Sequence, residues 1–464
     1  MSGTYYLRSF GCQMNEHDAE RIRALLEARG LAPAGEPDGA DVLVYNTCTV
    51  RKSADDRLAG HLGTAARLKR EDPRRIVLVT GCLPQAEKED LFRRFPFVDG
   101  ALGPQNLHHL GDLLDAAVEP EGPGGGADPS PVRPRGYFED GAAMSGDLEA
   151  RRERPFQAWV QIMSGCTNYC SYCIVPYVRG PERSRSLADV GAEVRRLVGD
   201  GVREVTLLGQ NVNAYGRDLG PGAGEGAPRS AVLSGSGFPA LLRALDAVDG
   251  LDRIRFMTSH PKDLSDELVA AVADSPSVCE HVHLPAQAGS DRILAAMRRG
   301  YTAEWFLGRV RALREAVPDV SITTDLIAGF PGETEQEFAQ TLDLVEAATF
   351  DAAYTFVYSP RRGTAAADLP GQLPADVKRE RVERLIVATQ RLALKSRSAW
   401  VGRRAEVLVE GASRDGRLLR GRTRQNVTVN VSGPSEAGAI VEVEVTAATT
   451  TTLRGTIAKA TSRR

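Results

Sequence analysis

The sequence of 464 residues lacks any apolar run near the roughly 20 residues that a helix needs to cross a bilayer. Its start also lacks the basic stretch and apolar core of an export signal. A strong charge of either sign is missing, because 58 Lys and Arg stand against 61 Asp and Glu, a net charge of -3. We therefore expect a cytoplasmic protein without membrane contact. A globally basic nucleic-acid binder is excluded, whereas a local basic patch is not.

Cysteines are few, and their number, seven, is odd. In a long cytoplasmic chain this favours metal or redox chemistry over disulfides. With 42% hydrophobic residues and no internal repeat, the chain has material for two to four domains.

Three of the cysteines lie in one short loop, after an apolar strand predicted at 156–163. The loop reads Gly165-Cys166-Thr167-Asn168-Tyr169-Cys170-Ser171-Tyr172-Cys173. Three thiolates on so short a tether can bind three corners of a 4Fe-4S cluster and leave the fourth iron open. Structural zinc normally has four protein ligands, and the next candidates along the chain are His260 and Cys279. Zinc with a distant ligand, or three buried cysteines, are the alternatives, and the density of thiols favours the cluster.

Three further cysteines share a position relative to predicted strands. The first hundred residues alternate strands at 4–10, 41–46 and 75–80 with helices at 16–29, 53–70 and 85–94, which predicts a doubly wound α/β domain over 1–118. Cys12, Cys48 and Cys82 each follow a strand, and the carboxyl ends of such strands share one edge of the sheet. A single cysteine here would be interpreted as a small buried residue. The repeated placement predicts a second cluster with three cysteine ligands, whereas Cys279 is predicted to be a core residue.

A Gly- and Pro-rich stretch at 119–151 is predicted to be a linker. The following domain, 152–394, shows about six β/α units, which predicts an open, partial (β/α)6 barrel with its chemistry at the carboxyl ends of the strands. Polar residues follow several predicted strands or lie within them, among them Gln210, Asn211, His260, His283 and Asp325. The stretch 217–237 is predicted to be a surface insertion.

The last segment, 395–464, has short alternating apolar runs separated by turns, which predicts a small antiparallel β-barrel. From residue 397 onward it carries 12 Lys and Arg against 6 Asp and Glu. Such a barrel can bind RNA through phosphate contacts, and a merely solvated basic face is the alternative. The candidate contacts are Arg417, Arg420, Arg422 and Arg424. A second basic run, 179–185, follows the CxxxCxxC loop and is a candidate for binding a carboxylate or a substrate phosphate.

The CxxxCxxC loop, with Tyr172 before its third cysteine, resembles the signature of radical S-adenosylmethionine (SAM) enzymes. This resemblance implies that Cys166, Cys170 and Cys173 hold the SAM-cleaving cluster. The segments of the central domain that contain Gln210, Asn211 and Asp325 also resemble motifs of these enzymes. The resemblance implies that these three residues and Tyr172 contact SAM.

The segments Gly11-Cys12-Gln13-Met14-Asn15-Glu16, Asn46-Thr47-Cys48-Thr49-Val50-Arg51 and Gly81-Cys82 resemble the amino-terminal domain of methylthiotransferases, and the basic barrel resembles the TRAM domain. The family resemblance implies an auxiliary 4Fe-4S cluster on Cys12, Cys48 and Cys82. It also implies methylthiolation of C2 of N6-isopentenyladenosine at position 37 of tRNA. The partners implied are the tRNA anticodon stem-loop, an electron donor protein and a sulfur donor protein, and we expect a monomer.

Two branches of the same superfamily remain as alternatives: enzymes acting on threonylcarbamoyl-adenosine of tRNA, and enzymes acting on a ribosomal protein. From a different class, a non-catalytic iron-sulfur RNA-binding protein is the other hypothesis. That protein would not cleave SAM when reduced.

Overall fold

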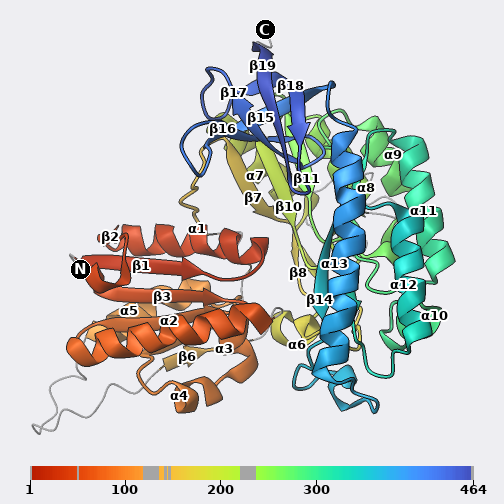
Figure 1. Cartoon of the computed structure of the whole chain (residues 1–464). Helices are drawn as coiled ribbons and strands as arrows, with labels where there is room; N and C mark the ends of the chain where they lie inside the picture. The colour runs from red at the N-terminus through yellow and green to blue at the C-terminus, as the bar shows by residue number, and fades with distance from the viewer. Residues whose placement is uncertain are drawn as a thin grey trace, which may run out of the picture. The chain divides into compact units, whose positions relative to one another are not determined.

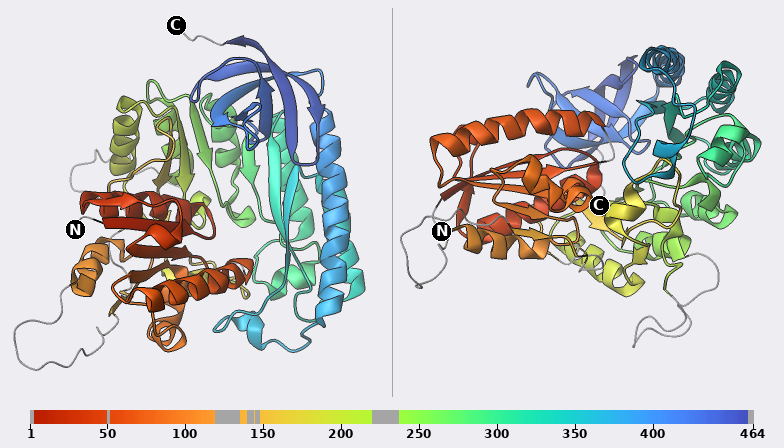
Figure 2. Two further views of the ribbon diagram at one scale, coloured as in Figure 1. Left: turned by 60° about the vertical axis from the view of Figure 1, so that its left-hand side comes forward. Right: turned by 90° about the horizontal axis from the view of Figure 1, so that it is seen from below.

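The computed structural model describes residues 3–49, 52–118, 135–139, 144, 148–219 and 237–460. The chain forms two compact units (Figures 1 and 2). The first contains Met1–Glu153, Val160–Thr167 and Cys173–Arg183, and the second contains Arg154–Trp159, Asn168–Tyr172 and Ser184–Arg464. Of the helices in these described ranges, none is long and apolar enough to cross a membrane.

The first unit is built on a parallel sheet with the strand order β2-β1-β3-β4-β5-β6 (Figure 1). Every residue of β3 and β4 is buried, because helices cover both faces of the sheet. The prediction of a doubly wound α/β domain is confirmed. The strands are β1 (Gly3–Ser9), β2 (Leu31–Pro33), β3 (Val42–Thr47), β4 (Ile76–Gly81), β5 (Gly100–Leu102) and β6 (Arg135–Tyr137).

Two apolar cores lie on opposite faces of this sheet. Helices α1 (Gln13–Ala28) and α5 (Leu110–Val118) pack on one face through residues such as Ile22 and Leu113. Helix α2 (Lys52–Glu71) packs on the other face through Leu58, Leu62 and Leu68. The short helices α3 (Cys82–Glu87) and α4 (Asp90–Arg94) share that second core.

Two sequence predictions differ from this fold. The helix expected at 85–94 begins at Cys82 and is broken at Lys88, whose φ of 48° is left-handed and cannot continue a right-handed helix. Part of the stretch predicted as linker forms β6, which pairs in parallel with β5. The sequence pattern missed β6 because a three-residue edge strand is held by backbone hydrogen bonds and needs few apolar side chains. The rest of that stretch up to residue 134 lies outside the described residues, as does 220–236 of the predicted insertion.

The central sheet of the second unit consists of two parallel halves, β11-β10-β7 and β12-β13-β14. A parallel bridge between Ile254 and Val278 joins them, which gives the six-stranded open barrel expected from the sequence. The strands are β7 (Gln157–Gln161), β10 (Glu204–Leu208), β11 (Arg253–Phe256), β12 (His281–His283), β13 (Ser321–Ala328) and β14 (Ala352–Val357). A separate two-stranded sheet pairs β8 (Met163–Ser164) with β9 (Arg183–Ser184).

Helices alternate with these strands along the chain (Figure 1). Five of them begin at a Ser or Thr whose side chain accepts a hydrogen bond from the first turn, which satisfies a backbone N–H that the helix leaves unpaired. The helices are α6 (Val175–Arg179), α7 (Leu187–Gly199), α8 (Gly237–Asp246), α9 (Asp266–Asp274), α10 (Asp291–Ala296), α11 (Ala303–Ala316), α12 (Glu335–Ala348) and α13 (Ala375–Ser398).

The carboxy-terminal strands close into a small barrel in the order β15-β16-β17-β19-β18 around a valine-rich core. The predicted antiparallel barrel is confirmed with one difference: β17 and β19 run parallel. Sequence patterning missed β16, whose alternate residues are arginines, and β19. The strands are β15 (Arg404–Ala412), β16 (Leu419–Thr423), β17 (Thr428–Ser432), β18 (Ile440–Ala448) and β19 (Thr452–Ala460).

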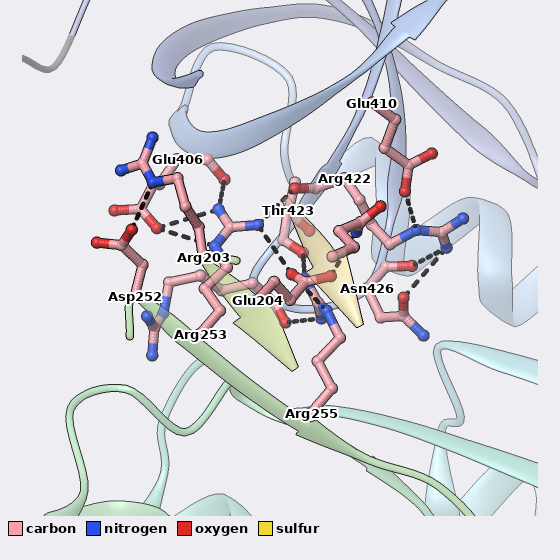
Figure 3. Close-up of polar contacts among 12 residues, drawn as sticks. Arg203, Glu204, Asp252, Arg253, Arg255, Glu406, Glu410, Arg422, Thr423 and Asn426 are labelled. Atoms are coloured by element: carbon pink, nitrogen blue, oxygen red, sulfur yellow. Dashed lines mark hydrogen bonds and ion pairs between the residues drawn. The ribbon is translucent and has the colours of Figure 1, made fainter. Parts of the chain in front are cut away.

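Two buried arginines of β11 attach the barrel to the sheet, by one ion pair and by hydrogen bonds to barrel carbonyls (Figure 3). Arg253 is fully buried and donates to Glu406 Oε1 (3.0 Å) and to the carbonyl of Arg422 (2.9 Å). Arg255 pairs with Glu204 (2.9 Å) and donates to the carbonyls of Thr423 (2.7 Å) and Arg424 (2.8 Å). These contacts hold the barrel against the sheet.

Candidate active site

The three amino-terminal cysteines come together at one edge of the first unit's sheet. Cys12 precedes α1, Cys48 follows β3 and Cys82 is the first residue of α3 after β4. Strands β1, β3 and β4 are neighbours, so their carboxyl ends present the three thiols side by side. A hydrogen bond with Cys48 lowers the pKa of the Cys12 thiol to about 6; the charge of Arg179 also lowers it and burial opposes both.

Close approach of these loops depends on two glycines with positive φ. A Cβ on Gly11 (φ 140°) would lie 2.4 Å from the Cys48 Cβ, and one on Gly81 (φ 98°) would lie 2.3 Å from the carbonyl oxygen of Thr47. Only glycine therefore lets the three thiols approach one another.

A pair of buried asparagines fixes the same loops. Asn15 donates to the carbonyl of Thr47 (2.9 Å), and Asn46 donates to the carbonyl of Asn15 (2.7 Å). The Cys12 thiol in turn donates to Asn15 Oδ1 (3.3 Å). These hydrogen bonds hold together the loops that carry Cys12 and Cys48.

Arg179, at the end of α6, is buried beside these thiols. Its pKa is raised: burial acts to lower it, but the charges of Cys82, Asp18 and Cys12 outweigh burial. Its Nη2 lies 3.7 Å from Asp18 and has no hydrogen-bond partner. Gln105 holds the Arg179 backbone by donating to its carbonyl (2.8 Å).

These residues suit an anionic iron-sulfur cluster. Three thiols on fixed loops supply the sulfur ligands, and a buried guanidinium with a free donor atom supplies positive charge next to them. Within the described ranges no set of three or more His, Cys, Asp or Glu side chains is arranged around a point as for a single metal ion. Three sulfur ligands beside a positive charge fit an anionic cluster.

The residues of the CxxxCxxC loop are divided between the two units, and hydrogen bonds anchor the loop within each of them. In the first unit, the backbone N–H of Cys166 donates to the carbonyl of Gly180 (3.1 Å). In the second, Ser171 donates through its N–H to the carbonyl of Met297 (3.1 Å) and through its hydroxyl to that of Ala296 (2.7 Å). The Cys170 thiol accepts a hydrogen bond from Arg299 Nη1 (3.4 Å).

The residues expected to contact SAM have different surroundings. Tyr172 packs beside the core that contains Phe330 and Tyr358 and accepts a hydrogen bond from Arg299 (3.4 Å). Asn211 is buried, donates to Asp263 (2.8 Å) and accepts from the backbone of His260 (3.0 Å), so it also holds the loop after β11. Gln210, the residue before Asn211 in the loop after β10, is partly exposed.

Asp325 lies in β13, with its carboxylate 3.5 Å from His283 Nε2 and 27% of its side chain exposed. His260 is also buried. Its burial is the main cause that lowers its pKa to about 2, and the charges of Arg299 and Lys262 add to this effect. His260 is therefore neutral at physiological pH and able to accept as well as donate a hydrogen bond.

The four candidate RNA contacts are not equivalent. Arg424 pairs with Glu280 (2.8 Å), and Arg422 pairs with Glu410 (3.0 Å) and donates to Asn426 Oδ1 (3.1 Å, Figure 3). Arg417 and Arg420 are exposed, and Arg420 Nε also lies 3.5 Å from Glu410. The first two help to build the barrel and its attachment, and the last two face solvent.

Two buried arginines were not recognised as parts of the cysteine sites from the sequence. The sequence shows Arg179 only as part of a basic run and gives no signal for Arg299. Only the fold could reveal them, because each reaches its cysteine from a distant or separately folded segment. Cys279 is buried in the core, as predicted.

Three family models match the chain. Residues 4–103 match Uncharacterized protein family UPF0004, 160–345 match the Radical SAM superfamily and 399–458 match the TRAM domain. A tRNA-2-methylthio-N(6)-dimethylallyladenosine synthase from Caldicellulosiruptor saccharolyticus is 46% identical, over 93% of this chain and 88% of the relative. A protein of the same name from Carboxydothermus hydrogenoformans is 44% identical over 96% of both chains.

The chain belongs to the tRNA-2-methylthio-N(6)-dimethylallyladenosine synthase family. This membership confirms the predicted enzyme class, a radical SAM methylthiotransferase, and its cofactors, two 4Fe-4S clusters and SAM. Among solved structures, the radical SAM methyltransferase TsrM from Kitasatospora setae is similar in fold, with a TM-score of 0.55, 16% identity and coverage of 79% of this chain and 77% of that one.

Proposed function

We propose that this member of the synthase family methylthiolates C2 of N6-isopentenyladenosine at position 37 of tRNA. The observation that carries the proposal is near full-length identity of 44–46% to synthases of that name, together with both three-cysteine sets. The base lies in a single-stranded loop, so it can be unstacked and enter a site at modest cost.

In this proposal Cys166, Cys170 and Cys173 hold the cluster that cleaves SAM, and Cys12, Cys48 and Cys82 hold the auxiliary cluster. When bound, the first cluster and SAM supply a radical that abstracts hydrogen, and the second supplies the site of sulfur insertion. The protein keeps SAM and base close together and excludes water. Tyr172, Gln210, Asn211 and Asp325 are the proposed SAM contacts, and Asn211 also holds the loop after β11.

The wider assignments are part of the same proposal. The domains are 1–118, 152–394 and 395–464, joined by 119–151. The substrate is the tRNA anticodon stem-loop, the enzyme works as a cytoplasmic monomer, and separate proteins donate electrons and sulfur.

The barrel offers a row of polar residues for the RNA backbone. Arg420 pairs with Asn430 across β16 and β17, and Asn430 pairs with Arg454 across β17 and β19. Directly paired residues share one face of a sheet, and both arginines are exposed. We assign phosphate binding to this row, with Arg417 beside it.

Replacing Arg420 and Arg454 with alanine should weaken RNA binding and make it less dependent on salt. Each lost phosphate contact lowers the slope of log affinity against log salt by about one, so the double variant should lose about two. Binding of a labelled anticodon stem-loop across a salt series measures this. Arg404→Ala is the matched control, because Arg404 is an exposed barrel arginine paired with Glu442 outside the row. An equal loss in the control would remove the row from the interface.

The direct test is mass spectrometry of nucleosides after reaction of the reduced, reconstituted enzyme with SAM, sulfide and isopentenylated anticodon stem-loop RNA. A methylthio adduct on that adenosine supports both substrate and reaction, and Cys166→Ala should abolish it. Stem-loops carrying threonylcarbamoyl-adenosine, and the ribosomal protein substrate of related enzymes, serve as competing substrates. Formation of deoxyadenosine without a methylthio adduct on the isopentenyladenosine would overturn the substrate assignment.

A further inference from the structure

Arg299 is a buried arginine that makes four hydrogen bonds, two of them to the CxxxCxxC loop. It lies just beyond α10 and only 4% of it is exposed. Its Nη1 donates to Cys170 Sγ and to the Tyr172 hydroxyl, both at 3.4 Å. Its Nη2 donates to the carbonyl of Pro285 (2.8 Å), and its Nε donates to the Tyr301 hydroxyl (3.0 Å).

The guanidinium is held rigidly by these partners. Tyr301 donates to the carbonyl of Ala286 (2.9 Å), and the Arg299 guanidinium carbon lies 5.4 Å from the centre of the Tyr301 ring. Ser171, next to Cys170 in the sequence, is bound twice to carbonyls at the end of α10. The same short segment, from the end of α10 to Arg299, therefore fixes the positions of both the arginine and the cysteine loop.

The charge of Arg299 has no carboxylate partner among the described residues: its hydrogen-bonded neighbours are a thiol, two phenols and a carbonyl. Arginine stays protonated in proteins, and an uncompensated buried charge is costly. The group next to it that can carry negative charge at neutral pH is Cys170, once it is a cluster-bound thiolate. The site is thus built to receive an anion at Cys170.

We propose that Arg299 is a positioning residue that raises the reduction potential of the SAM-cleaving cluster through its N–H···S hydrogen bond and its charge. One electron from an external one-electron reductant takes the cluster from its 2+ to its 1+ state, and the added negative charge is stabilised by the adjacent guanidinium. Hydrogen bonds to cluster sulfurs and nearby charge are established determinants of such potentials. The proposal rests on the assignment of Cys170 as a cluster ligand in the proposed function.

The test is a redox titration followed by electron paramagnetic resonance, in full-length protein carrying Cys12→Ala, Cys48→Ala and Cys82→Ala, so that a single cluster gives the signal. Arg299→Gln should lower the ratio of reduced to oxidised cluster about tenfold at a fixed potential, equal to about 59 mV for one electron. Arg299→Lys, which keeps the charge but loses the forked donor, should shift by less. Arg298→Gln is the matched control, because the neighbouring Arg298 is exposed.

An unchanged potential in Arg299→Gln, or an equal shift in Arg298→Gln, would overturn the proposal. If Arg299→Gln assembles no cluster, Arg299→Lys decides: a shifted potential supports the role, and an unchanged one refutes it. The titration needs no RNA. A failure of the tRNA assignment would therefore leave this result intact, and a failure here would leave the nucleoside assay intact.

Discussion

Replacing Cys12, Cys48 and Cys82 together with alanine should abolish the methylthio product while SAM is still cleaved to deoxyadenosine. The three thiols belong to the first unit's sheet edge and are joined there by the Cys12–Cys48 hydrogen bond and by Arg179. In the proposed function, the CxxxCxxC loop holds the other cluster with a separate set of three cysteines. Removing one set should lower bound iron from about eight to about four atoms per chain and eliminate sulfur insertion alone.

Iron analysis, deoxyadenosine assay and nucleoside mass spectrometry on the same preparation measure all three quantities. The matched control is Cys279→Ala, since Cys279 is a buried core residue outside both sets and should keep product and iron near the parent level. Product formation by the triple variant would show that sulfur insertion does not need these cysteines.

Arg253→Met should strongly destabilise the second unit. Arg253 is fully buried and spans from β11 to Glu406 and the carbonyl of Arg422 in the barrel, with Glu204 3.6 Å away (Figure 3). Removing one partner of a buried charge network leaves the others uncompensated and costs about 3–5 kcal/mol. We expect the lower end, about 3 kcal/mol, because Glu406 is one-third exposed.

Thermal unfolding of the anaerobic enzyme, monitored by circular dichroism, measures this as a midpoint lower by roughly 6–12 °C, at about 2–4 °C per kcal/mol. Arg243→Met is the control: Arg243 is an exposed arginine of α8, 3.5 Å from Glu267, and surface pairs contribute about 0–1 kcal/mol. Equal midpoints for the two variants would show that the buried pairs do not hold the barrel to the sheet.

Much of the architecture is predictable from local pattern. Strands such as β3 and β4 are uninterrupted apolar runs, and helices such as α12 begin at a Thr with a Glu three residues later, a capping signal that is visible in the sequence. The positions of Cys12, Cys48 and Cys82 after successive strands likewise predict their convergence, because parallel topology fixes which ends of the strands meet.

Tertiary contacts account for what the sequence pattern missed. Strand β16 carries Arg420 and Arg422 at alternate positions and was interpreted as a basic cluster, because its outward face is charged and its inward residues are Gly421 and Thr423. Arg424 was expected to face RNA, but its partner Glu280 lies 144 residues away in the sequence. Arg299 and Cys170 are 129 residues apart, so no local spacing connects them.

The attachment of the barrel has a geometric consequence for the substrate. Its ion pair with Glu406 starts from Arg253, the first residue of β11, whereas Cys170 lies in the loop that follows the carboxyl end of β7. An RNA held by the barrel while its base reacts must span at least the length of these strands, about 17 Å for five residues. In the proposed function, an RNA held by the barrel therefore extends along the sheet, from the end where the barrel is attached to the end where the base reacts.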